Sequence, residues 1–406
     1  MKKSFLALAV AAVAATALSS VASATTVYDK DGNSLDIYGR VQSVYYSDKW
    51  SDVSNEEGSF NTSARLGLNL RTQLTSGIAG FANAEWEAAN GDNAPDEEDG
   101  FDARYLFVGL DFGQFGQVKV GKFEEAIKYA ISPTDFFEDS ACVGLAGNDD
   151  RRESVVQYQW SGYGVDAILS YAFAKDNEHL DGAYKADENV DLDYSVSAAL
   201  GYTSPDVLFG PIGVRAGFLY GSFADGDENI WSENNGVRGP GNNVYDVTGN
   251  EYTVYDDYTQ FAVSAFWGSL DVGPYVAAAY QQREFTGKVI DGTNGNAVSG
   301  VSSPDYTVQG FEFTVAYTFT NGIKLATGYE MQTIDFDDDT ADLDAAAVPV
   351  MVMWNINPNF DVWAEARFDA GTDDDDPNTA NYVNFDEYAG TNYAENVFSL
   401  GLRYNF

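Results

Sequence analysis

The most regular feature of this chain is an alternation of apolar and polar residues that recurs about every twenty to twenty-five residues. In the final segment one face carries Phe398, Leu400, Leu402, Tyr404 and Phe406. The other face carries Ser399, Gly401, Arg403 and Asn405. A period of two is the signature of β-strands whose two faces meet different surroundings. The pattern therefore predicts strands with one apolar and one polar face.

Three further segments alternate in the same way and place charged residues on the polar face. In residues 360–369 the polar face carries Asp361, Trp363, Glu365, Arg367 and Asp369. In residues 35–42 it includes Arg40, and in residues 64–71 it includes Arg65. Because arginine at the midplane of a lipid bilayer would cost about 2–4 kcal/mol, these side chains are expected to face the inside of a closed sheet.

The connections between the alternating segments differ in length. Short turns fall at residues 75–77, 113–116, 161–164, 320–322 and 357–359. Long polar connections fall near residues 48–60, 89–101, 123–150, 175–190, 222–256, 283–306, 334–344 and 371–395. A soluble sandwich has no reason to keep every long connection at one end, whereas a transmembrane barrel does. Eight long connections imply sixteen strands, an even number that leaves an aqueous lumen.

Alternation is weakest in residues 103–112 and 212–223, which we expect to face another protein rather than lipid. Aromatic residues gather near the expected strand ends, among them Tyr46, Trp354 and Tyr404, as at the two interfaces of a membrane barrel. Together these patterns predict an all-β fold, a 16-stranded antiparallel transmembrane β-barrel.

The first 24 residues have the pattern of an export signal. Lys2 and Lys3 precede an apolar run from Phe5 to Leu18, and residues 22–24 (Ala-Ser-Ala) form a small-residue cleavage site. We expect residues 1–24 to be removed and residues 25–406 to form a single barrel domain. No later stretch approaches the roughly twenty apolar residues that a spanning helix needs.

The chain is strongly acidic, with 22 Lys and Arg against 63 Asp and Glu and a net charge of −41. Loss of Lys2 and Lys3 would leave 20 basic residues against the same 63 acidic ones, a charge of −43. This acidity argues against nucleic acid as a partner, because nucleic acid needs a basic surface. It fits either a saline habitat or a surface that attracts cations.

Candidate catalytic and metal-binding residues are sparse. Cys142 is the only cysteine, which excludes an intramolecular disulfide and a zinc site built from cysteines. His179 is the only histidine and lies in a polar segment, so a Ser-His-Asp site would have to be built on a loop. The acidic runs 92–99, 337–339 and 373–376 lack the spacing of a helix–loop–helix calcium site, although divalent ions could bridge them to lipopolysaccharide. We therefore expect no enzyme activity, no cofactor and no resident metal.

Two segments near the start of the chain are YDKDGNSLDIYGR (28–40) and ARLGL (64–68). The first resembles the mature opening of Gram-negative general diffusion porins, and the second resembles their second strand. FSLGLRYNF (398–406) resembles their closing strand, in which the terminal Phe406 would serve as a membrane-assembly signal. The resemblance implies a homotrimer in the outer membrane, in contact with lipid and lipopolysaccharide, that passes small hydrophilic solutes and ions.

The resemblance also implies that the third long connection folds inward and narrows the pore with acidic groups opposite basic groups of the wall. By position, Asp135 and either Glu138 or Asp139 resemble the acidic set. The basic set resembles Arg40, Arg65, Arg104 and one of Arg151 or Arg152. The family's Pro-Glu-Phe-Gly-Gly stretch is replaced here by EDSAC (138–142), which leaves open which carboxylate points into the pore.

Opposed charges across a narrow gap would align polar solutes and exclude apolar ones, and the acidic excess would attract cations. We therefore predict a water-filled, cation-favouring channel for passive diffusion. A sugar-specific porin is an alternative, but it would need lumen-facing aromatic residues on successive strands. Apart from Tyr38 and Trp363, no such run is apparent. A surface adhesin or receptor barrel is also compatible with the long loops.

Overall fold

The computed structural model describes residues 24–47, 58–90, 101–139, 151–180, 182, 189–224, 237–238, 244–245, 251–291, 305–336, 342–373, 385 and 393–406. The strands in the first half of the chain are β1 (Thr25–Lys30), β2 (Asn33–Tyr46), β3 (Ser59–Thr75), β4 (Ile78–Asn90), β5 (Asp102–Asp111), β6 (Gln117–Glu124), β7 (Arg151–Gly162), β8 (Val165–Ala172), β9 (Lys175–His179) and β10 (Asn189–Val207). The remaining strands are β11 (Gly210–Phe223), β12 (Val237–Arg238), β13 (Val244–Tyr245), β14 (Glu251–Gly268), β15 (Gly273–Asp291), β16 (Tyr306–Thr318), β17 (Ile323–Phe336), β18 (Leu343–Asn357), β19 (Phe360–Asp369) and β20 (Val397–Asn405). The short helices are η4 (Gly113–Phe115) and α2 (Ile127–Ile131).

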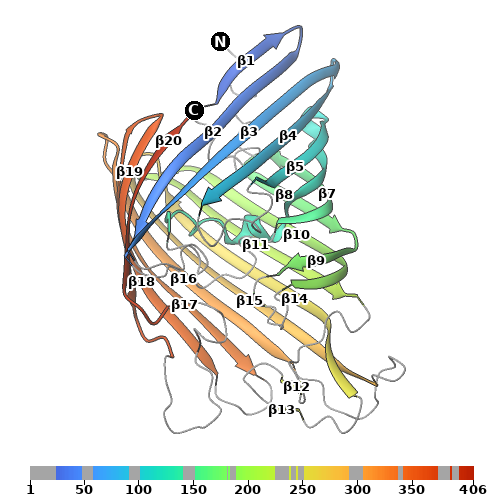
Figure 1. Cartoon of the computed structure of the whole chain (residues 1–406). Helices are drawn as coiled ribbons and strands as arrows, with labels where there is room; N and C mark the ends of the chain where they lie inside the picture. Colours follow the sequence, from blue (N-terminus) through green and yellow to red (C-terminus); the bar gives the residue numbers. More distant parts are fainter. Residues whose placement is uncertain are drawn as a thin grey trace.

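The strands close into a ring. Each pairs antiparallel with the next, and β20 returns to pair with β2, where Arg40 is opposite Asn405. In the described part of the chain the ring has sixteen members, from β2 to β8, then β10, β11 and β14 to β20 (Figure 1). At the seam the backbone N–H groups of Gly39 and Phe406 each donate to the other residue's carbonyl oxygen, at 2.9 and 3.0 Å. The predicted 16-stranded antiparallel barrel is confirmed.

The two ends of the barrel differ. One end carries β1, the C-terminus and the short turns (Figure 1), and it is called the turn end below; the opposite end is the loop end. The five predicted short turns all separate paired strands. Three of them use glycines with positive φ, namely Gly113 (62°) with Gly116 (89°), Gly164 (79°) and Gly322 (84°), where a side chain would strain the backbone.

Three connections that the sequence predicts as loops are partly strand. β15 continues to Asp291 within the expected loop 283–306, β14 begins at Glu251 within 222–256, and β9 lies within 175–190. The loop prediction was wrong there because these segments are polar. Backbone pairing beyond the lipid layer does not require apolar side chains, so polar residues continue the strands.

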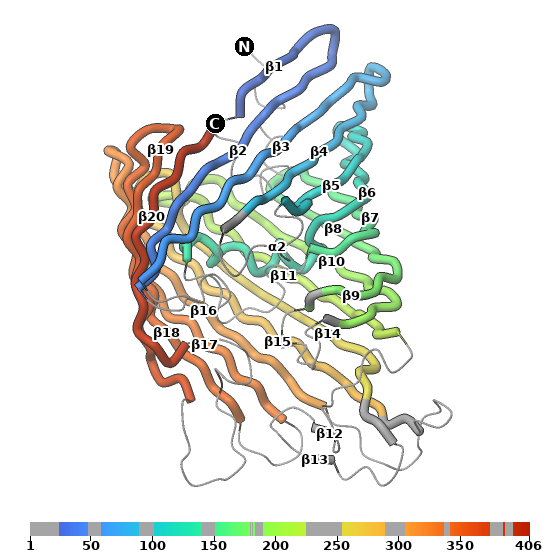
Figure 2. The backbone as a smooth tube through the Cα atoms, in the orientation of Figure 1, coloured from blue at the N-terminus to red at the C-terminus, as the bar shows by residue number. Residues whose placement is uncertain are grey.

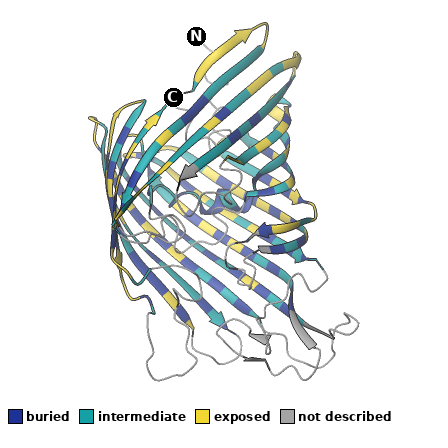
Figure 3. Ribbon diagram, in the orientation of Figure 1, coloured by how far each residue is buried: buried dark blue, intermediate teal, exposed yellow. Residues whose placement is uncertain are grey.

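Exposed and enclosed side chains alternate along the strands (Figure 3). On β20, Leu400, Leu402 and Tyr404 are 47–50% exposed on the outer face. On β19, Trp363, Glu365 and Arg367 are at most 4% exposed and face inward. The predicted faces of both strands are therefore confirmed.

The aromatic residues near strand ends do not all face outward. Trp354 (45% exposed) and Tyr404 lie on the outer face, as at a lipid–water interface. Tyr46 is only 2% exposed and donates a hydrogen bond to Asp139 inside the barrel, so its placement at the interface was wrong.

The blurred alternation of β5 and β11 has internal causes. In β5 the register shifts between the pairs Glu85–Tyr105 and Trp86–Ala103, so that Arg104 is an extra, bulged residue. In β11 glycines face inward: Gly217 lies against α2, and Gly221 lies under the ring of Tyr258. Neither feature needs a protein partner to explain it.

No helix in the part of the chain that the structure describes is long and apolar enough to cross a membrane.

Candidate functional site

The described part of the third long connection, up to Asp139, runs inside the barrel, as predicted. Figure 2 shows α2 within the ring of strands. The backbone N–H of Ala126 donates to Ser197 Oγ on β10 at 3.1 Å, and Ser264 Oγ on β14 donates to the carbonyl oxygen of Ala130 at 2.5 Å. Tyr275 on β15 donates from its hydroxyl to the carbonyl oxygen of Pro133 at 2.7 Å. The connection therefore follows the inner wall from β10 to β15.

The end of α2 is fixed by Arg215 of β11. Its guanidinium donates to the carbonyl oxygen of Tyr129 at 3.2 Å and to Ser132 Oγ at 2.5 Å, and it lies 4.3 Å from the centre of the Tyr129 ring. A cation that satisfies the carbonyl groups at a helix end and stacks on a ring holds the helix in one position.

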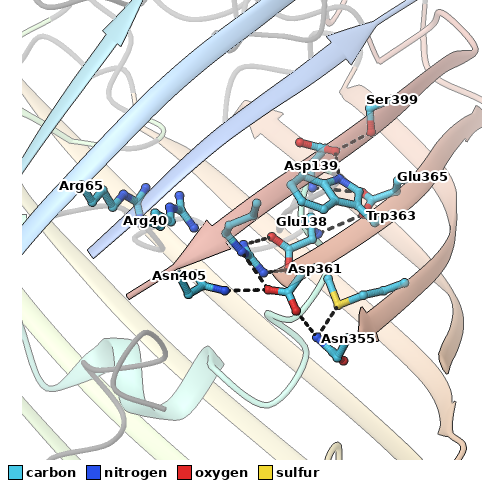
Figure 4. A network of polar contacts seen from close by, with 12 residues as sticks. Arg40, Arg65, Glu138, Asp139, Asn355, Asp361, Trp363, Glu365, Ser399 and Asn405 are labelled. Carbon is cyan, nitrogen blue, oxygen red and sulfur yellow. Dashed lines mark hydrogen bonds and ion pairs between the residues drawn. The ribbon is translucent and has the colours of Figure 1, made fainter. Parts of the chain in front are cut away.

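The described tip of the connection docks on β19 and β20. Arg403 of β20 donates to both carboxylate oxygens of Glu138, at 2.6 and 3.0 Å. The carboxylate of Glu365 on β19 accepts the backbone N–H groups of Glu138 (2.9 Å) and Asp139 (3.2 Å). Figure 4 shows these groups converging from the loop and from the wall. A bidentate arginine–carboxylate pair combined with two charge-assisted backbone bonds gives a precise anchor.

Asp139 is held by three donors of the wall. They are the Tyr46 hydroxyl at 2.9 Å, and the Trp363 indole N–H at 2.8 Å and the Ser399 hydroxyl, both drawn in Figure 4. Burial raises the pKa of Asp139 above its ordinary value in spite of these bonds. Burial also acts to raise the pKa of Glu138, but the Arg403 guanidinium outweighs it and holds that pKa below its ordinary value. The pKa values of these two neighbouring carboxyl groups are therefore shifted in opposite directions.

Beside this anchor, the wall carries a network of arginines and glutamates. Glu87 of β4 accepts from Arg65 Nε (2.6 Å) and from an Arg104 terminal nitrogen (2.6 Å), and it lies 3.9 Å from Arg40. Arg104 also reaches Glu85 at 3.1 Å. In the strand register Arg40 is opposite both Arg65 and Asn405.

Arg403 extends the network to Asp361 at 3.2 Å. We call the following set the charged ladder: Asp361, Arg403, Glu138, Arg40, Arg65, Glu87, Arg104 and Glu85. These eight described residues include four arginines and four carboxylates, so the ladder is electrically balanced.

Arg104 joins the ladder through the bulge in β5. Strict alternation along the strand would place Arg104 on the same face as Leu106 and Val108, which are 52% and 61% exposed on the outer face. The extra residue at the bulge reverses the parity, so Arg104 faces inward.

Three other candidates lie outside the ladder: Arg151 and Arg152 at the root of the third connection, and Asp135 within it, beyond α2. Asp135 pairs with Lys128 inside the connection at 2.8 Å. Arg151 lies 3.5 Å from Glu124, next to the Tyr105 ring. Arg152 is enclosed and donates to Glu125 (3.2 Å) and Ser195 (2.5 Å).

The other residues named in the sequence analysis lie away from the ladder or outside the described part of the chain. Phe406 lies at the barrel seam. Cys142 lies outside the described residues, as do the acidic runs 92–99 and 337–339 and most of 373–376. The backbone of His179 belongs to β9.

Sequence analysis missed four residues of the ladder: Glu85, Glu87, Asp361 and Arg403. The signal was present, because Arg403 and Asp361 stand on the predicted polar faces and Glu85 and Glu87 flank Trp86 in alternation. What the sequence lacked was the strand register that brings β4, β19 and β20 together with the strands of the predicted arginines.

A row of inner aromatic residues corrects a second expectation. Successive strands contribute Phe223 (β11), Tyr255 (β14), Phe285 (β15), Tyr306 (β16) and Phe336 (β17), with ring centres 4.7, 5.8, 4.8 and 6.2 Å apart. The conclusion that no such run exists was wrong, because the residues are dispersed over more than a hundred positions. All five rings are at most 4% exposed, so they are packed rather than open to a solute.

A closed barrel with an apolar outer face, an inward-folded connection and charged inner walls is the architecture of a membrane channel. A family model described as Gram-negative porin matches residues 7–374, and the chain belongs to that family. Outer membrane protein S2 of Salmonella typhi is 25% identical in an alignment of 441 positions that spans both chains completely. This protein is an outer-membrane porin, a channel rather than an enzyme.

Two solved structures share the fold. OmpF of Salmonella typhi, in complex with daunomycin, aligns with a TM-score of 0.67 and 18% identity over 94% of this chain and 100% of that one. OmpT of Vibrio cholerae, folded in vitro and in its trimer form, aligns with a TM-score of 0.59 and 16% identity over 93% of this chain and 100% of that one.

Proposed function

We propose that this porin is a general diffusion channel: water-filled, cation-favouring, and passable by small hydrophilic solutes and ions. The charged ladder is the observation that carries the proposal. Arginine and glutamate side chains that line a narrow, wet passage create a transverse field in which polar solutes align. Because the ladder itself is balanced, its charge does not repel ions of either sign, and the chain's excess of acidic groups sets the preference for cations.

Within this proposal the candidate residues take different roles. Arg40, Arg65 and Arg104 form the basic wall of the constriction, and Glu138 forms its acidic side. Asp139 holds the loop tip against the wall. Asp135 braces the third connection from within through Lys128, and Arg151 and Arg152 stabilise its root; none of the three lines the narrow point.

The reversal potential across a planar bilayer in a potassium chloride gradient tests the ion preference. We expect the sign of a cation-selective channel. A reversal potential at zero or of the opposite sign would remove the cation preference and leave the channel itself intact.

We also propose a homotrimer that contacts outer-membrane lipid and lipopolysaccharide, with residues 1–24 removed during export. The trimer form of the Vibrio cholerae relative supports the assembly. Unheated gel electrophoresis should show a band of three times the monomer mass that collapses on boiling, and a mature N-terminus at residue 25 is expected from mass spectrometry. A monomer band without heating, or retained residues 1–24, would contradict each proposal separately.

A sugar-specific channel is the second candidate, and the inner aromatic row is the observation that favours it. The rings would have to be uncovered to meet a sugar, and they are enclosed. Titration of the open channel with oligosaccharides distinguishes the two: we expect no saturable block of the current.

A further inference from the structure

Four neighbouring turns at the turn end of the barrel carry exposed apolar side chains. They join β5 to β6, β7 to β8, β10 to β11 and β14 to β15, strands that follow one another around the ring. The exposed residues are Phe115 (69%), Tyr163 (98%), Leu208 (88%) and Val272 (51%). Apolar side chains that are exposed together along one rim mark a contact surface, whereas scattered ones do not. We call these four residues the collar.

The other turns of the ring at this end have a different character. The turn from β3 to β4 consists of residues 76–77 (Ser-Gly), and the turn from β18 to β19 consists of residues 358–359 (Pro-Asn). In the turn from β16 to β17 the one apolar residue, Phe319, packs on Tyr317 of its own hairpin, with ring centres 4.7 Å apart. The collar therefore occupies one sector of the rim.

Two collar residues stand at positions that bulky side chains disfavour. The backbone φ is 57° at Tyr163 and 62° at Leu208, in the left-handed region. Two-residue hairpin turns prefer Asn, Asp or Gly at such a position. Turn geometry therefore does not explain the tyrosine and the leucine, whereas a contact made by their side chains does.

The collar is joined directly to the membrane-facing surface of the barrel. Trp267, on the outer face of β14, stacks on Phe209 with ring centres 4.1 Å apart, and its indole N–H donates to the carbonyl oxygen of Val207 at 2.8 Å. On the outer face of β7 the Tyr158 hydroxyl donates to the carbonyl oxygen of Phe115 at 2.8 Å. Aromatic residues of the lipid-facing surface thus hold two of the four turns.

These bonds fix the depth of the collar relative to the bilayer. Indole rings of membrane barrels lie where lipid meets water. Each interfacial layer outside the hydrocarbon is about 5–7 Å thick, and one residue of extended chain spans about 3.3 Å. Leu208 directly follows the residue whose carbonyl oxygen accepts from Trp267, so Leu208 lies within the interfacial layer.

The charge of these turns indicates which lipid they suit. Asp206 and Asp271 are exposed beside the collar. The four turns contain no lysine or arginine, which holds for all of residues 112–116, 163–164, 208–209 and 269–272. Carboxylates without basic neighbours repel anionic headgroups and tolerate zwitterionic ones.

We propose that the collar enters the lipid leaflet at the turn end, that this leaflet is zwitterionic phospholipid, and that the contact sets the depth of the β5–β15 sector in the membrane. The apolar surface of the barrel then extends past its aromatic residues in this sector only. The charged ladder and the passage of solutes do not depend on it.

Fluorescent probes on the collar test the proposal. In a Cys142→Ser background, Leu208→Cys and Tyr163→Cys carry an environment-sensitive dye in phosphatidylcholine vesicles, with or without bromine on the acyl chains. Leu400→Cys, 49% exposed on the outer face of β20, is the control in lipid, and Ser76→Cys is the control in water.

Brominated lipid should quench both collar probes and the Leu400 probe. Acrylamide, a neutral quencher in the water, should quench the collar probes at least about fivefold less than the Ser76 probe. Anionic phosphatidylglycerol in the vesicles should weaken bromolipid quenching at position 208 and leave it unchanged at position 400. Collar probes as open to acrylamide as the Ser76 probe would overturn the proposal and leave a soluble partner as the occupant. Equal quenching with and without phosphatidylglycerol would remove the preference for zwitterionic lipid.

The combined substitution Tyr163→Asn and Leu208→Asn gives a second test, decided by the sign of the effect. Asparagine suits the left-handed positions better, so it should favour folding if the tips meet water. In lipid the lost apolar contact outweighs this gain, and the equilibrium constant for folding in phosphatidylcholine vesicles, measured by urea unfolding, should fall about tenfold. Ser76→Asn is the control and should change it little. A rise in the double variant, or an equal fall in the control, would refute the contact. Single-channel conductance should stay unchanged throughout, so the diffusion channel is tested separately.

Discussion

Glu87 is the residue whose loss should change selectivity most, because it is the shared acceptor of the arginine wall. Its carboxylate lies 2.6 Å from Arg65, 2.6 Å from Arg104 and 3.9 Å from Arg40, and its side chain is 20% exposed. The substitution Glu87→Gln removes one negative charge from a balanced ladder and leaves a net positive charge beside the passage. It keeps the size of the side chain, so the barrel should still form.

The size of the effect follows from Coulomb's law. A monovalent ion that passes about 5 Å from a unit charge in water interacts with it by about 0.8 kcal/mol. Screening at about 0.1 M salt leaves about 0.5 kcal/mol, or about twofold in the local concentration of an ion. Because cations are depleted and anions enriched, the cation-to-anion permeability ratio should fall about fourfold.

Reversal potentials in a potassium chloride gradient measure this ratio. Glu153→Gln is the matched control, since Glu153 is 45% exposed and pairs with Lys122 and Lys175 outside the ladder. We expect a small shift in the control and the full shift in Glu87→Gln. Equal shifts in the two variants would show that Glu87 does not stand at the narrow point.

Three further predictions concern the wall, the loop tip and the packing of the barrel. Arg40→Ala combined with Arg65→Ala should increase both single-channel conductance and cation preference; unchanged values would place neither side chain at the constriction. Because burial raises the pKa of Asp139, its carboxylate takes up a proton at a higher pH than the usual value of about 3.9. Cation preference should therefore fall on mild acidification, and this change in reversal potential with pH should be absent in Asp139→Asn. If the variant shows a change of equal size, another group is responsible for it. Gly67→Ala would drive a methyl group into the ring of Tyr38 and lower the free energy of unfolding by about 1–3 kcal/mol, whereas the methyl group of Gly77→Ala meets open space. Heat-dependent gel mobility should show earlier unfolding in the first variant only, and equal midpoints would refute the packing argument.

The fold was largely predictable because one physical constraint acts on every strand. Lipid outside and water inside impose a period of two, and residues 360–369 and 398–406 show it without interruption. The prediction failed where the constraint stops: beyond the lipid layer, Phe285 and Lys288 belong to β15 although the sequence there is polar enough to suggest a loop.

The site was predictable only in part, because its residues come from different strands and the sequence does not show the register in which those strands pair. Arg40 and Arg65 could be placed inside by the cost of exposing arginine to lipid. Arg104 could not, because only the bulge in β5 turns it inward. Which carboxylate of the third connection meets an arginine was also open from sequence; the structure pairs Glu138 with Arg403.

The dependence of single-channel conductance on salt concentration tests the central claim most directly. If the charged ladder lines a water-filled passage without a binding step, purified protein in planar bilayers should give discrete current steps whose size rises in proportion to potassium chloride concentration. Saturation of the conductance at moderate salt, or the absence of current steps from correctly folded protein, would contradict a water-filled channel that ions cross by diffusion without binding.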